Sequence, residues 1–106
     1  MTERNLNYFL VISGHISSNK KKEFEQTFRL AFSSISGDCL EYSLSADSNK
    51  EGGYHFFSLW LNEGAMKSFM DSMEYQLMNG AFHALGSVNK TFNGKVLETH
   101  RHFSGI

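Results

Sequence analysis

The chain has 106 residues, enough for one domain with a real core. Its formal net charge of −1 and the scattered signs of its charges argue against a nucleic-acid surface, which needs a basic stripe. The single cysteine, Cys39, excludes an internal disulfide and a cysteine-based zinc cluster within one chain. The opening MTERNLN is polar, and the apolar run at residues 8–12 is far shorter than the ~20 residues of a membrane span. We therefore expect one cytoplasmic domain over residues 1–106, with no nucleic-acid or membrane partner.

The first half of the chain alternates between strand and helix patterns. Residues 8–16 alternate as a buried strand does, and residues 20–36 carry apolar side chains at helical spacing. Ser17, Ser18 and Asn19 offer cap side chains for that helix. Residues 39–46 alternate as a half-buried strand, and residues 47–53 are rich in turn-forming types.

The second half contains the most aromatic stretch. Residues 54–60 predict a buried strand that ends at Trp60, and Asn62 is a suitable helix N-cap. Apolar residues then recur at helical spacing over residues 66–85, with Ser72 capping a second helical piece and Gly86 ending it. The pair at 93–94, Asn-Gly, predicts a hairpin turn before a last strand over residues 96–103.

This order of elements predicts a ferredoxin-like α+β fold, the split βαβ arrangement in which helices cover one face of an antiparallel sheet. Phe57, Leu59 and Leu61 point away from the face that holds Phe56 and Trp60, so both faces of this strand are apolar. An apolar second face needs a partner. We therefore expect a homodimer that pairs sheet to sheet as a dimeric α+β barrel.

Two stretches resemble the antibiotic biosynthesis monooxygenase family: SGDCLEYSLSAD at residues 36–47, and the spacing of Trp60, Asn62, Ala65, Ser72 and Glu74 with GAFHALG at residues 80–86. The resemblance covers nearly the whole chain. It implies a pocket between sheet and helices, with Trp60 in its wall, that holds a small aromatic such as a quinol or a polyketide. It further implies oxidation by O₂ without a cofactor or a metal.

On this reading the substrate-binding side chains are Trp60, Phe56, Phe69, Met73 and Phe82, although the helical part of this set also fits ordinary core packing. The polar catalytic group would be His15 or Tyr75, since a phenol-oxidising site uses a base that titrates near neutral pH or a hydroxyl placed on the ligand. Tyr42 and Tyr54 can also present a hydroxyl.

Many members of the family carry a histidine on the second helix. This chain departs from that pattern, because Phe69 occupies the position. It also has Phe56 and Met66 where the polyketide-oxidising branch has Asn and Tyr. The alternative function is therefore a non-enzymatic dimeric module that binds a small ligand or is only structural. The haem-degrading branch of the family uses a tryptophan on the second helix. This branch is excluded, since the only tryptophan, Trp60, lies on the predicted strand. A third option is a metal role for His100 and His102.

Overall fold

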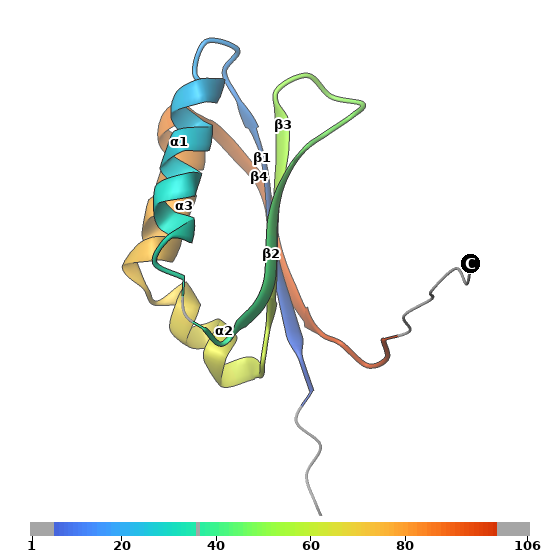
Figure 1. The fold of residues 1–106 in the computed structure, drawn as a ribbon. Coiled ribbons are helices and arrows are strands. Elements are labelled where there is room, and N and C mark those ends of the chain that lie inside the picture. Colours follow the sequence, from blue (N-terminus) through green and yellow to red (C-terminus); the bar gives the residue numbers. More distant parts are fainter. Residues whose placement is uncertain (1–5, 36, 100–106) are drawn as a thin grey trace, which may run out of the picture.

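The computed structural model describes residues 6–35 and 37–99, which form a four-stranded sheet with helices against one face (Figure 1). The elements follow in the order β1 (Tyr8–Ile16), α1 (Lys21–Phe32), β2 (Cys39–Ala46), β3 (Gly53–Trp60), α2 (Glu63–Met70), α3 (Met73–Leu85) and β4 (Gly86–Lys95). The strand order is β2-β3-β1-β4 with every neighbouring pair antiparallel. This confirms the predicted ferredoxin-like α+β fold. Within the described ranges, no helix has the length and apolarity to cross a bilayer.

Aromatic rings fill the layer between the sheet and the helices. Phe24 and Phe28 of α1, Phe56 of β3 and Phe82 of α3 have no exposed surface. The ring centroid of Phe28 lies 5.6 Å from those of both Phe56 and Phe82. Each such ring contributes about 2 to 3 kcal/mol through burial, so this cluster contributes strongly to the stability of the fold.

One buried hydroxyl satisfies two polar groups inside this layer. Ser58 of β3 is fully buried, accepts a hydrogen bond from Trp60 Nε1 at 2.9 Å and donates one to the Leu10 carbonyl oxygen at 3.0 Å. The indole of Trp60 stacks on Phe69, with ring centroids 4.6 Å apart. The Trp60 N–H therefore already has a partner within the chain.

The predicted caps are correct for the later helices and wrong for α1. Asn62 Oδ1 accepts from the Ala65 N–H, and Ser72 Oγ accepts from the Tyr75 N–H, so α2 and α3 begin as predicted. The first helix has Lys20 at its N-cap position with no side-chain cap.

That first helix also ends at Phe32 and does not reach the predicted residue 36. The backbone tightens there, because the Ile35 N–H bonds to the Phe32 carbonyl. The Ser33 hydroxyl also donates to the Leu30 carbonyl at 2.6 Å. These bonds replace the helical ones, and the helix stops.

The hairpin turn predicted at Asn93-Gly94 is wrong. Both residues lie inside β4, which runs directly from the end of α3 and pairs with β1 up to Lys95. A side chain at position 94 would overlap the ring of Phe9 on the neighbouring strand, so the glycine serves close packing and not a turn. Residues 96–99 are not a strand, and the rest of the predicted last strand lies outside the described residues.

The sheet face away from the helices, which we name the open face, has an apolar part and a polar end. Strand alternation and register place the apolar side chains together: Phe9, Val11, Phe57, Leu59 and Phe92. Phe9 and Phe92 pack edge to face at 6.1 Å. Nearer the β2–β3 turn the same face carries Ser13, Ser45, His55 and Lys90. The predicted second apolar face is therefore present, except that Leu61 lies beyond the end of β3. The homodimer stays a prediction.

Replacing Ser58 by alanine tests the buried hydroxyl. The change leaves the Trp60 N–H without its partner in the core, and an unsatisfied buried group costs about 1 to 3 kcal/mol. We expect Ser58→Ala to lower the free energy of unfolding in urea by about 1 to 3 kcal/mol. Ser43→Ala, on exposed β2, should change it by less than about 0.5 kcal/mol. Equal effects of the two substitutions would contradict the role of Ser58.

Candidate functional site

Two of the predicted substrate-binding residues lie in the packed core. Phe56 and Phe82 are fully buried against the rings of α1 and have no surface to offer a ligand. Trp60, which is also fully buried, and Phe69, which is 5% exposed, lie beneath a cleft of about 500 Å³ beside the start of α2. Ile35, Asn62 and Ser72 also line that cleft, which we name the Trp60 cleft. The structure therefore brings two of the five predicted residues to one opening.

The other predicted site residues, Tyr75, Met73 and His15, are not among the residues that line the Trp60 cleft. Tyr75 packs edge-on against Phe69 at 5.5 Å, and burial raises the pKa of its hydroxyl. Met73 is 81% exposed, so its place in the buried apolar stripe of α3 was wrongly predicted. It is the first residue of that helix, before the buried positions begin. His15 lies on the open face, where its Nε2 is 3.0 Å from the Glu51 carbonyl oxygen.

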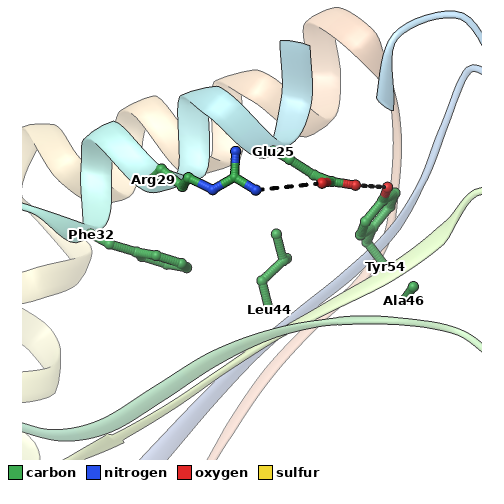
Figure 2. A pocket seen from close by; sticks show the side chains of 6 residues that line it. All are labelled: Glu25, Arg29, Phe32, Leu44, Ala46 and Tyr54. Atoms are coloured by element: carbon green, nitrogen blue, oxygen red, sulfur yellow. Dashed lines mark hydrogen bonds and ion pairs between the residues drawn. The ribbon is translucent and has the colours of Figure 1, made fainter. Parts of the chain in front are cut away.

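A second cleft of about 330 Å³ lies between α1 and the edge of the sheet (Figure 2). We name it the α1–β2 cleft; its lining residues are Glu25, Arg29, Phe32, Leu44, Ala46 and Tyr54. Figure 2 shows the three side chains of α1 facing those of β2 and β3 across the gap. The cleft combines one apolar wall, formed by Phe32 and Leu44, with a polar end.

The polar end is a linked set of three groups. The Tyr54 hydroxyl donates to Glu25 Oε2 at 2.6 Å, and Arg29 Nη2 lies 3.9 Å from Glu25 Oε1. Burial and the neighbouring Glu25 carboxylate raise the pKa of Tyr54 to about 12, because both disfavour a phenolate. At neutral pH the cleft thus presents a phenol donor, a carboxylate acceptor and an exposed guanidinium.

Strand alternation and helix period explain this geometry. Tyr54 follows the same side of β3 as Phe56, and its ring packs on Phe24 at 4.8 Å, so its hydroxyl reaches the edge of α1. Glu25 and Arg29 are one helical turn apart and share that edge. Sequence reasoning considered the Tyr54 hydroxyl but missed Glu25 and Arg29, for which the four-residue spacing was the available signal.

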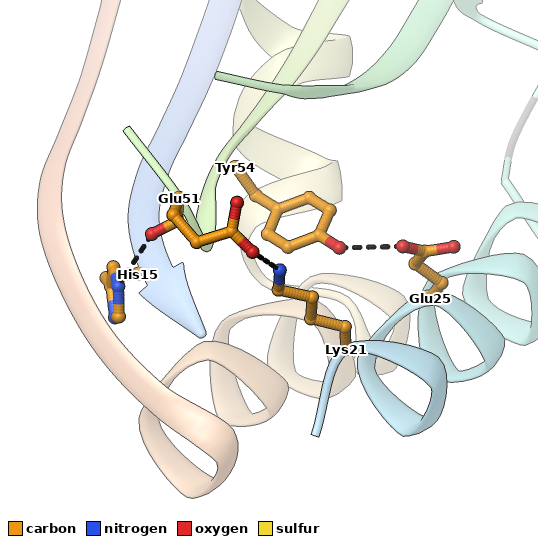
Figure 3. Close-up of polar contacts among 5 residues, drawn as sticks. All are labelled: His15, Lys21, Glu25, Glu51 and Tyr54. Carbon is orange, nitrogen blue, oxygen red and sulfur yellow. Dashed lines mark hydrogen bonds and ion pairs between the residues drawn. The ribbon is translucent and has the colours of Figure 1, made fainter. Parts of the chain in front are cut away.

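The β2–β3 turn is tied to both sides of the sheet near this cleft (Figure 3). The carboxylate of Glu51 pairs with Lys21 at the start of α1, and its backbone carbonyl faces His15 on the open face. Gly52 beside it has a φ of 81°, and a side chain there would overlap the Ile16 carbonyl. The turn is therefore held close against the end of β1.

The part of the chain that the structure describes contains no group of three or more His, Cys, Asp or Glu side chains placed to hold a metal ion. The metal option at His100 and His102 concerns residues outside the described ranges.

Comparison with solved structures agrees with the fold. SnoaB of Streptomyces nogalater, described as a cofactor-independent oxygenase and solved in a mutant form, is similar with a TM-score of 0.71 at 16% identity over 88% of this chain and 95% of that one. A provisionally assigned antibiotic biosynthesis monooxygenase of Caulobacter crescentus gives 0.75 at 17% identity, covering 91% and 92%. One from Nitrosomonas europaea gives 0.75 at 7% identity, covering 92% and 96%.

At these identities the likeness establishes the fold alone. The chain has the α+β fold of the antibiotic biosynthesis monooxygenases, as the sequence resemblance implied. No known family model matches the chain, and no curated protein matches it in sequence.

The raised pKa of Tyr54 predicts a late ionisation. The difference in tyrosinate absorbance between the native chain and Tyr54→Phe should rise at about pH 12, well above the ordinary value of about 10. Because the folded-state pKa is raised, Tyr54 stabilises the fold below about pH 10, and this contribution is lost as pH rises toward the folded-state value. Glu25→Gln should move the ionisation of Tyr54 to lower pH. A difference signal centred near pH 10 would contradict this assignment.

Proposed function

We propose that this chain is a cofactor-independent monooxygenase of the antibiotic biosynthesis type, acting on a small phenolic such as a hydroquinone or an anthrone in the α1–β2 cleft. The observation that carries the proposal is the cleft itself, in which Tyr54, Glu25 and Arg29 converge beside an apolar wall. The fold shared with SnoaB, which is described as a cofactor-independent oxygenase, supports the same reaction class.

In this mechanism the aromatic ring packs against Phe32 and Leu44, and a substrate hydroxyl reaches the polar end. Glu25 Oε1 accepts the hydroxyl proton while Tyr54 remains a donor to Oε2. The Arg29 guanidinium offsets the negative charge of the phenolate or enolate that forms. The anion reduces O₂ directly, and one of its carbon atoms bonds to oxygen to give a hydroperoxide. Loss of the C–H proton from that carbon breaks the O–O bond, so that one oxygen atom remains as a carbonyl and the other leaves as water; the substrate supplies all the electrons.

A second candidate function is ligand binding without turnover. Two observations favour it: aromatic rings fill the core between sheet and helices, and among the described residues no histidine lines either cleft. A site of this kind would hold the same aromatic ligands through Phe32, Leu44 and Tyr54 and leave them unchanged.

Oxygen uptake by the purified, metal-free protein over a panel of hydroquinones and anthrones separates the two functions. We expect uptake above the buffer rate, falling at least about tenfold in Glu25→Gln and in Arg29→Met, since each loses a group that handles the developing charge. Glu23→Gln and Lys22→Met, elsewhere on α1, are the matched controls and should retain the rate. Calorimetric binding without any uptake would replace the enzyme with the binding module.

The same assay tests the residues predicted from the sequence. Tyr54→Phe should slow uptake, whereas Tyr75→Phe and His15→Ala should leave it unchanged, because their side chains lie outside the α1–β2 cleft. Trp60→Phe changes the lining of the Trp60 cleft, so its uptake rate shows whether substrate binds there. Uptake that depends on Trp60 and not on Glu25 would move the substrate to that cleft.

We further propose that the open face forms a homodimer through its apolar part. Phe57 and Leu59 at its centre face away from the helices, next to Phe9 and Phe92 of the neighbouring strands. Contiguous apolar surface of this kind on a sheet favours sheet-to-sheet packing about 10 Å apart.

Light scattering after size exclusion tests the dimer. The native chain should elute with the mass of two chains and Phe57→Glu with the mass of one, since a charge buried between two sheets has no partner. Leu30→Glu makes the same kind of change at a helix residue that is 69% exposed and should leave the dimer intact. A monomeric native chain would contradict the proposal.

A further inference from the structure

Three polar side chains on the open face form a continuous hydrogen-bonded chain, on the opposite side of the sheet from α1. His55 Nδ1 lies 2.8 Å from Ser13 Oγ, and His55 Nε2 lies 3.0 Å from Asp47 Oδ2. Ser13 and His55 are register partners on β1 and β3, and Asp47 reaches them from the turn that follows β2. We name this set the Ser13–His55–Asp47 chain.

The direction of the hydrogen bonds follows from the chemistry of Asp47. Its pKa is lowered by a hydrogen bond from the Asn49 N–H and then by the bond with His55, so the carboxylate is ionised at neutral pH and can only accept. A neutral His55 must therefore carry its proton on Nε2, which leaves the Nδ1 lone pair to accept from the Ser13 hydroxyl. This is the arrangement in which an imidazole acts as a base toward a serine.

The surroundings suit a reacting serine. The β1–β4 register shifts between Ser13 and Gly14, where β4 contains one extra residue, and bulges of this kind change the direction of side chains beside reactive sites. Lys90 is the register partner of Ser13 on β4, and its ammonium lies 4.9 Å from the ring centre of Phe92.

The site is also open to a reagent. The side chains of His55 and Asp47 are 44% and 26% exposed. The homodimer proposed above uses the apolar rows and places this polar row at its rim.

We propose that Ser13 is a nucleophile for acyl transfer from small aryl esters to water, with His55 as its general base and Asp47 as the residue that positions His55. This proposal does not rest on the proposed oxygenase function, because the two sites lie on opposite faces of the sheet. Ser13 and His55 contact the reacting atoms; Asp47 acts through His55.

The reaction balances without an oxidant or a cofactor. Ser13 Oγ bonds to the ester carbonyl carbon as its proton passes to His55 Nδ1, and the Lys90 ammonium offsets the charge of the tetrahedral oxyanion. The bond from that carbon to the aryl oxygen breaks, and the phenol leaves with the proton. A water molecule deprotonated by His55 then attacks the acyl carbon, which releases the carboxylic acid and returns the proton to Ser13.

The test is the reaction of the full chain with p-nitrophenyl acetate. We expect a burst of p-nitrophenolate of one equivalent per chain, and peptide mass spectrometry should place the acetyl group on Ser13. Ser13→Ala should abolish the burst. Ser45→Ala, which removes a hydroxyl from the register partner of His55 on β2, should keep it.

Two further substitutions test the relay. His55→Gln should slow acylation about 100-fold, as expected for loss of a general base. Asp47→Asn can still accept from the Asn49 N–H, but its amide donates to His55 Nε2, which moves the imidazole proton to Nδ1 and removes the acceptor for Ser13. It should therefore slow acylation at least about tenfold, with no change in half-saturating ester concentration or in melting temperature.

Acetyl groups found only on lysine, or no acetylation of Ser13, would overturn the proposal. So would acetylation of Ser13 at the native rate in both His55→Gln and Asp47→Asn, because Ser13 would then react without the relay. Circular dichroism of each variant confirms that the fold is retained.

Discussion

The packing of aromatic rings between the sheet and the helices is the constraint on which the rest of the structure depends. Phe28 contacts rings from β3 and α3 at once, and the Ser58 hydroxyl satisfies the Trp60 N–H within the same layer. Protein interiors are packed as densely as organic crystals, and the rings of this layer lie in contact with one another in the same way. Two openings lie at its margins, between α1 and β2 and beside the start of α2.

Most of the fold could be predicted from the sequence because the deciding signals are local. Period-two alternation located β1, β2 and β3, and the side chains of Asn62 and Ser72 cap the helices that follow them. The hairpin prediction at Asn93-Gly94 was wrong because the contact that decides the structure there is not local. The glycine is required by the ring of Phe9, far away in sequence, and a local turn signal cannot be distinguished from this need for close packing.

The candidate sites were predicted less well, since they depend on contacts between distant segments. The bond from Tyr54 to Glu25 joins residues 29 apart, and that from Ser13 to His55 joins residues 42 apart. Both pairs form only in one particular register of strands and helix, which residue types do not specify. Trp60 and Phe69, which were predicted from the sequence to lie in one site, do stack on each other, since the helix of Phe69 directly follows the strand of Trp60. Their role in binding a ligand stays a prediction.

The turn between β2 and β3 contacts side chains on both faces of the sheet. At one end of the turn Asp47 is hydrogen-bonded to His55. Near the other end, the Glu51 carboxylate pairs with Lys21 of α1, and the Glu51 carbonyl oxygen contacts Nε2 of His15. A ligand that displaces α1 from the sheet would thus shift the same segment that orients His55. Thermodynamic linkage makes such an effect reciprocal. The Lys21–Glu51 pair is solvent-exposed, and exposed ion pairs are weak, so communication between the faces through this pair is weak.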